Sequence, residues 1–405
     1  MRFQDVIGQE HVKQHLVEMV AHNRLSHALL FLGKEGAGAL PLAMAFAQYV
    51  ALLPRRDAAP ADSLFGEPVE LKLPGTPAAA DAWMEQQPSF AKADGLVHPD
   101  IHYSYPVIPR KSGDKPVSTD YISEWREFVR QYPYGNAYDW LQFIEAENKQ
   151  GNITAYECND IIRKLNLKSF ESGYKILVMW MPEYLGKEGN KLLKLIEEPP
   201  PDTLFLLVAE NEGAILNTIL SRCQLVKVPA LDRADIESAL LARAGAAPEA
   251  ARSLANAAHG NYREALHLQQ HADEDFGALL KEWLNATVGR KPAAQLKAIE
   301  DIARLGREKQ KQFLRYFTHL IEGAVRAEVL EGPALDALLA TFSAGEQDWA
   351  QRLNKVMNLA QKEAVALELD TAAYHVERNA NAKILFHALT IKIYHIIRNG
   401  VVVSV

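Results

Sequence analysis

Residues 29–40 read Leu-Leu-Phe-Leu-Gly-Lys-Glu-Gly-Ala-Gly-Ala-Leu. The apolar start is typical of a short buried strand, and a second apolar-rich segment runs from Leu40 to Leu53. Gly33, Gly36 and Gly38 lie between these two segments. They fit a tight turn, because glycine adopts backbone conformations that other residues avoid. This order predicts a strand, a glycine-rich loop and a helix.

The loop has the glycine spacing of a phosphate-binding loop, G-x-x-x-x-G-K-S/T, but lacks the lysine and the hydroxyl that bind phosphate and magnesium. In that motif backbone amides cradle phosphate oxygens, the lysine neutralises the outer phosphates and the hydroxyl holds magnesium. Here the lysine position is Ala39 and the hydroxyl position is Leu40. We therefore expect this chain to bind no nucleotide productively and no metal ion.

Two further apolar runs, at 176–181 and 204–209, flank a helical segment at 189–197. Runs of this length are typical of parallel strands that are buried on both faces, and they predict an α/β core. The carboxylates that hold magnesium in a nucleotide hydrolase would stand at the end of the first run. The nearest one is Glu183, which follows Pro182, so hydrolysis loses another contributor.

The rest of the chain differs in composition. From Pro54 to Pro116 it is rich in proline, alanine, aspartate and glycine, which is typical of a surface insertion. Beyond Pro229 the strand signals end, and apolar residues such as Leu280 and Trp283 recur at helical spacing. The last third of the chain is therefore predicted to be helical.

An aromatic and charged stretch extends from Tyr121 to Glu147. Interleaved aromatic and basic side chains are able to bind single-stranded nucleic acid by stacking. The alternative is a small packed subdomain, which we favour because acidic residues are at least as frequent there as basic ones.

The overall composition limits the function classes. The formal charge is −7 and the pI is near 6.0, which argues against a protein that holds nucleic acid through a basic surface of its own. Cys158 and Cys223 are too few for a disulfide framework or a four-cysteine zinc site, and His98 and His102 fit loop positions better than metal ligands. Without a signal peptide or a long apolar run, we expect a cytoplasmic protein that does not enter a membrane.

A long phrase points to a known family. Residues 190–200 read Asn-Lys-Leu-Leu-Lys-Leu-Ile-Glu-Glu-Pro-Pro, and Ser-Arg-Cys follows at 221–223. This phrase closely resembles the pattern of the AAA+ clamp-loader family, and so do Val-Ile-Gly-Gln at 6–9, the segment 26–31 and His-Pro-Asp at 98–100. Recognisable pattern covers roughly residues 1–53 and 156–270.

The resemblance implies an α/β AAA+ fold, which is a P-loop NTPase-like parallel sheet with flanking helices, followed by a small helical lid and an all-α C-terminal collar domain. The implied domains are 1–229 for the core, with an insertion at about 54–155, then 230–272 for the lid and 273–405 for the collar and oligomerisation. The degenerate loop is similar to that of the delta-prime type of subunit of the bacterial DNA polymerase III clamp loader.

The resemblance also implies site residues. Arg222, within Ser221-Arg222-Cys223, would project into the ATP site of an adjacent ATPase subunit, where an arginine stabilises the transferring phosphoryl group. Any ATP and magnesium would then be bound by the neighbour and not by this chain. Arg263 occupies the position of a nucleotide-sensing lid arginine and is expected to be a structural remnant.

The implied partners are ATPase subunits of the gamma/tau type and a delta-type subunit in a hetero-oligomeric ring, with the sliding clamp and primed DNA reached through the assembled complex. Two other functions remain open. One is an active AAA+ ATPase with an atypical phosphate loop that uses Lys34 and Glu183. The other is a single-strand-binding accessory protein that acts through the aromatic residues from Trp125 to Phe143.

Overall fold

The computed structural model describes most of the chain, namely residues 1–54, 73–111, 113–146, 149–270, 276–332, 335, 344–378 and 380–399. Two compact units are present. The first comprises residues 1–247 and 258–267, and the second comprises residues 248–257 and 268–405. The boundaries expected at 229/230 and 272/273 remain predictions.

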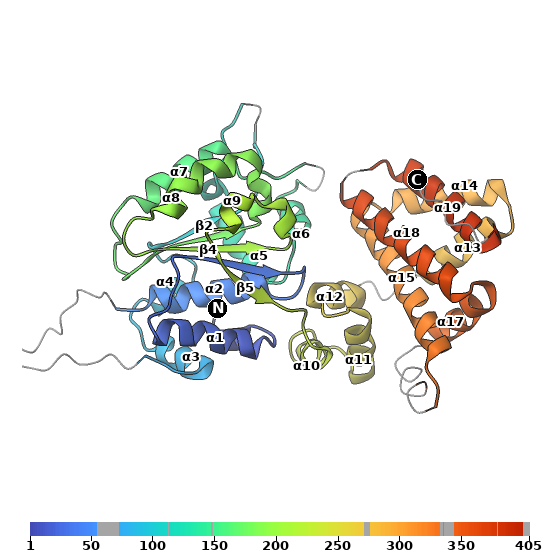
Figure 1. The fold of residues 1–405 in the computed structure, drawn as a ribbon, viewed down its shortest axis with the longest axis horizontal. Coiled ribbons are helices and arrows are strands. Elements are labelled where there is room, and N and C mark those ends of the chain that lie inside the picture. The colour runs from blue at the N-terminus through green and yellow to red at the C-terminus, as the bar shows by residue number, and fades with distance from the viewer. Residues whose placement is uncertain are drawn as a thin grey trace, which may run out of the picture. The chain divides into compact units, whose positions relative to one another are not determined.

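The first unit is built on a five-stranded sheet with the order β2-β3-β4-β1-β5, in which all pairs of neighbours are parallel (Figure 1). The strands are β1 (Ala28–Gly33), β2 (Ile101–Ser104), β3 (Lys175–Trp180), β4 (Thr203–Ala209) and β5 (Gln224–Val228). Parallel neighbours require crossover connections, which the helices supply. The predicted strand, loop and helix are present, and the predicted parallel α/β core is confirmed.

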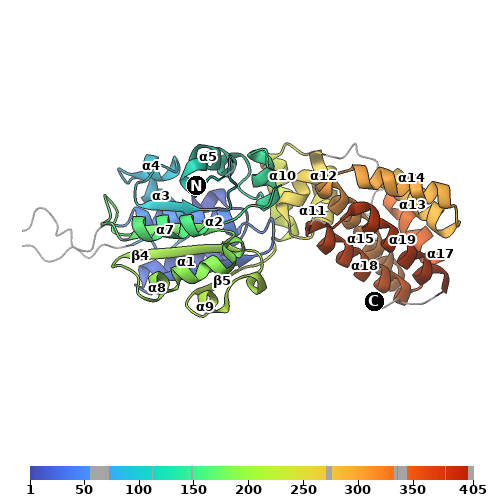
Figure 2. The ribbon, with the colours of Figure 1, turned by 90° about the horizontal axis from the view of Figure 1, so that it is seen from above.

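Both faces of the sheet are buried. In β4, alternate residues enter two separate apolar cores, with Leu206 in one and Phe205 in the other. The helices α1 (Glu10–Ala21) and α2 (Ala39–Ala51) cover the first face, and α7 (Ala155–Leu165) and α8 (Leu193–Glu197) cover the second (Figure 1) (Figure 2). A strand that is buried on both faces needs apolar residues at every position, which explains the continuous apolar runs.

This unit has further helical segments. They are η1 (Phe3–Asp5), α3 (Pro77–Glu85), α4 (Phe90–Asp94), η2 (Ser118–Tyr121), α5 (Ile122–Gln131), α6 (Ala137–Phe143), η3 (Pro182–Leu192), η4 (Glu212–Ala214), α9 (Asn217–Leu220), α10 (Arg233–Arg243) and most of α12 (Tyr262–Gln270).

The interpretation of residues 54–116 as a surface insertion is wrong for α3 and β2, which contribute to the core and the sheet. Strand β2 lies within this segment and pairs with β3, and Met84 of α3 is fully buried in the same core as α2. His102 is part of β2 and does not lie in a loop as expected. Residues 55–72 and 112, which the same interpretation covered, are outside the described part of the chain.

The aromatic stretch is part of this core. Trp125, Phe128 and Trp140 are fully buried, and the ring of Trp125 stacks on Tyr105 with centroids 4.1 Å apart. The Trp140 indole donates to the carbonyl of Pro106 at 2.6 Å. Because these ring faces already contact protein, they are not available to stack on nucleotide bases, which supports the packed-subdomain alternative.

Among its described residues the second unit contains helices and no strand, as predicted. It contains α11 (Pro248–Ala257), α13 (Phe276–Val288), α14 (Pro292–Arg304), α15 (Arg307–Val329), α17 (Ala344–Val356), α18 (Leu359–Glu377) and α19 (Ala382–Asn399). The helices α15, α18 and α19 lie side by side around an apolar core (Figure 2). Over the described residues of the whole chain, no helix combines the length and apolarity that a membrane crossing requires.

Candidate functional site

The glycine-rich loop follows β1 and leads directly into α2. Gly36 and Gly38 have positive φ angles of 70° and 93°, which favour glycine. A Cβ atom on Gly36 would lie 1.8 Å from Oδ1 of Asn261, and one on Gly38 would lie 3.0 Å from the ring of Tyr134. These two side chains therefore lie directly on the loop, where a phosphate would need free space.

Tyr134 is the main obstruction. Its ring packs edge-on against Tyr262, with centroids 5.1 Å apart, and its hydroxyl accepts a hydrogen bond from the amide of Ile7 at 2.7 Å. Burial raises the pKa of Tyr134 well above its usual range, so the phenol stays neutral. The cavity that remains between the loop and Tyr134 has a volume of about 20 Å³, enough for one water molecule. Sites for small molecules usually measure roughly 300–1,000 Å³.

A group of charged side chains covers the other side of the loop. The guanidinium of Arg263 is 3% exposed and donates to both carboxylate oxygens of Asp139, at 2.5 and 2.6 Å, and to Oε1 of Glu35 at 3.0 Å. The amides of Asn136 and Asn261 also donate to Glu35, each at 3.1 Å. We call Glu35, Asp139 and Arg263 the Arg263 cluster.

Local helix capping positions the members of this cluster. The Asn136 side chain caps the N-terminus of α6. Asp139, at the third position of the helix, accepts a hydrogen bond from the backbone N–H of Asn136 at 3.1 Å. Asn261 accepts from the amide of Glu264 at 3.0 Å at the start of α12. The cluster therefore joins α6, α12 and the loop, and it brings two carboxylates and one guanidinium to the loop. That charge balance is unfavourable for a polyphosphate.

Glu183, the carboxylate nearest the end of β3, is bound to backbone amides. Oε1 of Glu183 accepts from the amides of Glu210 and Asn211, at 2.7 and 2.9 Å, so Glu183 binds the backbone at the end of β4. Lys34 is exposed and makes no ion pair among the described residues. Glu183 is therefore held by the backbone at the end of β4, whereas Lys34 remains exposed to solvent.

The role of Glu183 predicts a pH dependence of stability. Burial raises the pKa of its carboxyl above the ordinary 4.5, so its contribution to stability is complete below that value and falls as the pH rises through the raised pKa. Glu183→Gln keeps an acceptor oxygen and does not ionise. In urea unfolding, the stability of Glu183→Gln relative to the wild type should therefore increase from about pH 4 to about pH 7. A constant difference over this range would contradict the prediction.

Arg222 lies at the surface, in the turn between α9 and β5. It forms an ion pair with Glu197, the last residue of α8, and donates to the carbonyl of Thr218 at 2.6 Å. About a third of its side chain remains exposed, at 32%. The Ser-Arg-Cys motif and the Ile-Glu-Glu-Pro-Pro motif are therefore in direct contact, although they are separated in the sequence.

The sheet places Arg222 far from the chain's own loop. In the parallel pair of β1 and β5, Leu29 aligns with Gln224 and Gly33 aligns with Val228. Arg222 precedes the N-terminal end of β5, and the loop follows the C-terminal end of the neighbouring strand β1. The five aligned residues span roughly 17 Å at about 3.3 Å each. Arg222 therefore cannot serve the glycine loop of its own chain.

Other expected residues have structural contacts. Ser221 donates to the carbonyl of Thr218 at 3.2 Å, and burial raises the pKa of the Cys223 thiol to about 11, so it remains neutral. The buried Asp100 of the His-Pro-Asp phrase accepts from the amides of residues 170–172 and holds that turn. Among the side chains that the structure describes, no group of three or more His, Cys, Asp or Glu is arranged to hold a metal ion.

Three residues of the site were not identified from the sequence, namely Glu35, Tyr134 and Asp139. The spacing of Asn136 and Asp139 is that of a helix N-cap with an acidic residue at the third position, so it could have indicated that the Asp139 side chain is held in place at the start of a helix. No local pattern shows that its partner is Arg263, which lies more than 100 residues away in the sequence.

Comparison with known proteins finds similarity to subunits of DNA polymerase III. The family model described as "DNA polymerase III, delta subunit" matches residues 84–232. The DNA polymerase III subunit delta' of Bacillus subtilis is 26% identical over 263 residues, which are 65% of this chain and 60% of the relative. The delta' subunit of Haemophilus influenzae is 37% identical over 75 residues, which are 18% of this chain and 23% of the relative.

The tau subunit of Escherichia coli is 27% identical over 276 residues, covering 67% of this chain and 33% of the relative. Among solved structures, a gamma subunit-related protein of Thermotoga maritima aligns with a TM-score of 0.38 and 13% identity, over 95% of this chain and 99% of that one. The match to the B. subtilis delta' subunit spans about 60% of that relative's length, and the match to the tau subunit spans about a third.

Proposed function

Because this chain belongs to the clamp-loader family of DNA polymerase III subunits, we propose that it is a delta-prime-type subunit that does not hydrolyse ATP. In this role it works in the cytoplasm within a hetero-oligomeric ring, beside ATPase subunits of the gamma/tau type and a delta-type subunit. The ring places a sliding clamp on primed DNA. Arg222 of this chain completes the ATP site of the adjacent ATPase subunit.

One observation carries this proposal: the arginine precedes the N-terminal end of β5, whereas the degenerate loop follows the C-terminal end of the neighbouring strand β1. An arginine that cannot reach its own loop, yet stays partly exposed, is suited to a partner's site. Its ion pair with Glu197 fixes the direction of the guanidinium before any partner arrives, which limits the entropy lost on binding.

The glycine-rich loop supports the proposal that this chain does not hydrolyse ATP. The positions of the phosphate-binding lysine and the magnesium-binding hydroxyl are held by Ala39 and Leu40, both buried. The space beside them is filled by Tyr134 and by the Arg263 cluster. Each lost contact to a transferring phosphoryl group commonly costs a few kcal/mol of transition-state stabilisation, so their joint loss leaves little catalysis.

The second unit fits the expected oligomerisation domain. Its helices enclose an apolar core of their own, with Trp283 fully buried and its indole bonded to Thr390 at 2.9 Å. A unit with an independent core holds a fixed shape, as a ring contact requires. We propose that this unit supplies the collar contact to neighbouring subunits.

The isolated chain should not bind nucleotide. Titration of the chain with Mg-ATP should give no saturable heat and no shift in the thermal midpoint, because a ligand that binds the folded state stabilises it by mass action. The Ala39→Lys, Leu40→Thr double variant should also fail to bind, since Tyr134 still fills the space beside the loop. Micromolar binding by the wild type would overturn the prediction that the filled loop holds no nucleotide.

Assembly provides a second test. When the full chain is mixed with gamma/tau-type and delta-type subunits, all three should elute together in size-exclusion chromatography. A chain that elutes alone at micromolar concentration would contradict its place in the ring.

A further inference from the structure

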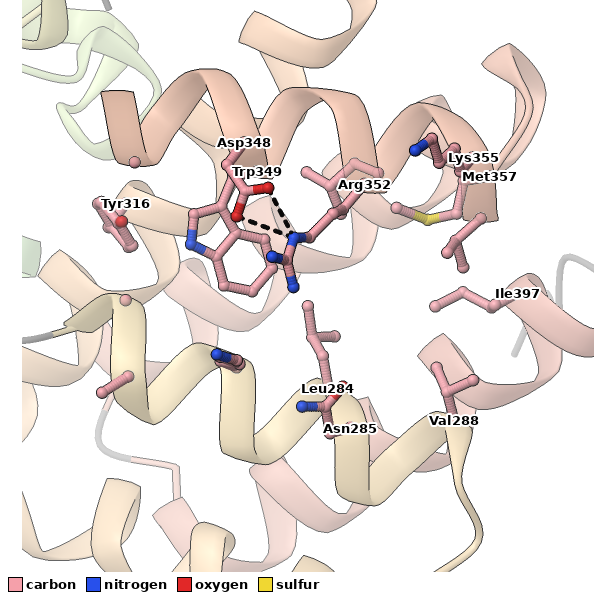
Figure 3. Close-up of a pocket in the computed structure, with 16 residues that line it drawn as sticks. Leu284, Asn285, Val288, Tyr316, Asp348, Trp349, Arg352, Lys355, Met357 and Ile397 are labelled. Atoms are coloured by element: carbon pink, nitrogen blue, oxygen red, sulfur yellow. Dashed lines mark hydrogen bonds and ion pairs between the residues drawn. The ribbon is translucent and has the colours of Figure 1, made fainter. Parts of the chain in front are cut away.

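The second unit contains a groove that the proposed function does not use. It has a volume of about 640 Å³ and lies between α13 and α17 (Figure 3). The helix α17 packs on α15, whereas α13 packs mainly on α14 and α19, so a gap remains between α13 and α17. The two helices run alongside one another across this gap in Figure 3.

The interior of the groove is apolar. Leu284 of α13 and Trp349 of α17 line opposite sides of the gap, and Val288, Met357 and Ile397 lie together at one end (Figure 3). Trp349, Val288 and Ile397 are only partly buried. Covering such side chains is favourable because it removes apolar surface from water, and a contiguous apolar groove on a folded domain usually marks a binding site.

The rim of the groove is basic. Arg352 is paired with Asp348 at 2.8 Å, whereas Lys281 and Lys355 make no ion pair among the described residues. The lining thus contains three basic side chains and one carboxylate. The whole chain has a formal charge of −7, so this local excess of positive charge stands out and favours an acidic occupant.

We infer that this groove binds an amphipathic helical segment of a partner protein, with a short apolar stripe flanked by carboxylates. An apolar stripe at helical spacing fits a trough between two helices, as in other helix-in-groove complexes. Carboxylates beside the stripe would pair with Lys281 and Lys355. The chain's own segment 400–405 has no acidic side chain and lacks this chemistry. The inference does not rest on the proposed function.

Two synthetic helical peptides test the inference with the full chain. Both carry the same leucine stripe at positions i, i+3, i+4 and i+7, one with glutamates beside the stripe and one with lysines. Fluorescence anisotropy at low salt should show the glutamate peptide binding about tenfold more tightly, because complementary charges are attractive and like charges are repulsive. Equal affinity for the two peptides would overturn the inference.

Charge reversal locates the site. Lys281→Glu with Lys355→Glu should reverse the preference between the peptides, whereas Lys297→Glu with Lys383→Glu, outside the groove, should leave it unchanged. Val288→Asp should weaken both peptides about tenfold by placing a charge on the apolar wall. Circular dichroism is the control that checks whether each variant is folded. The same effect from both lysine pairs would show that the net charge of the chain, and not the groove, attracts the peptide.

Deletion of residues 400–405 tests the competing occupant. The truncated chain should bind the glutamate peptide as the full chain does. A gain of about tenfold on truncation would mean that this segment competes for the groove, and it would overturn the assignment to a partner protein.

Discussion

If Arg222 completes a neighbour's ATP site as proposed, replacing it with alanine is expected to slow ATP hydrolysis about 1,000-fold at that one site of an assembled loader. Such a loss corresponds to about 4 kcal/mol of transition-state stabilisation. The physical reason is that a guanidinium supplied from a partner offsets the charge that develops on the transferring phosphoryl group. This chain's own fold should be unaffected, because Arg222 lies at the surface and its contacts are the ion pair with Glu197 and hydrogen bonds to Thr218 and Ser221 within its own turn.

The measurement must separate one site from the others in the ring. A single-turnover experiment with labelled ATP and primed DNA does so, because the rapid phase should lose the amplitude of one site while the other sites continue. Clamp loading should fall with it. Arg163→Ala is a matched control, since Arg163 is also a surface arginine in an ion pair, with Asp160, and should change neither quantity.

Two more variants refine the role of Arg222. Arg222→Lys keeps the charge but loses the planar fork, so it should recover only part of the rate. Glu197→Ala should have a smaller effect than Arg222→Ala, because it removes the residue that orients the guanidinium and not the guanidinium itself. If the rapid phase of Arg222→Ala has its full amplitude, the arginine is an ordinary surface residue and the proposal for a trans role is wrong.

The parts of the fold that were predictable from the sequence are those with strong local patterns. β3 and β4 are continuous apolar runs because both their faces are buried, and the glycine loop between β1 and α2 is marked by its composition. β2 has four residues in a proline-rich context, and β5 alternates exposed and buried positions near an edge. Neither gives a pattern that differs clearly from that of a loop.

The site divides in the same way. The loop and Arg222 belong to contiguous motifs, and their neighbours in the sequence identify them. The filling of the loop was not predictable, because Tyr134 and Asp139 reach it from a segment about 100 residues further along the chain. The sequence shows that Ala39 and Leu40 cannot hold phosphate and metal. It does not show that other side chains have taken the space.

The second large effect is expected for Arg263, which should prove essential for stability and not for nucleotide sensing. Its side chain is 3% exposed, and Asp139 and Glu35 beside it are 12% and 14% exposed. Removing one partner of a buried ion pair usually costs 3–5 kcal/mol, roughly, because a buried charge is left without compensation. Arg263→Ala should lower the free energy of unfolding by about that amount in urea denaturation, with faster hydrogen exchange in α12. Arg304→Ala, at an exposed pair, should change stability by less than about 0.5 kcal/mol.

A charge-free version of the cluster separates two explanations for this loss. If Arg263→Ala is destabilising because it leaves Glu35 and Asp139 unpaired, then Arg263→Met combined with Glu35→Gln and Asp139→Asn should recover most of the stability, since no buried charge remains. If the loss comes from missing contacts across the glycine loop, the triple variant should be as unstable as Arg263→Ala. Neither variant should gain affinity for Mg-ATP, because Tyr134 still covers Gly38. The first outcome would show that a carboxylate–arginine cluster now holds α12 against a loop whose frame resembles a phosphate-binding site.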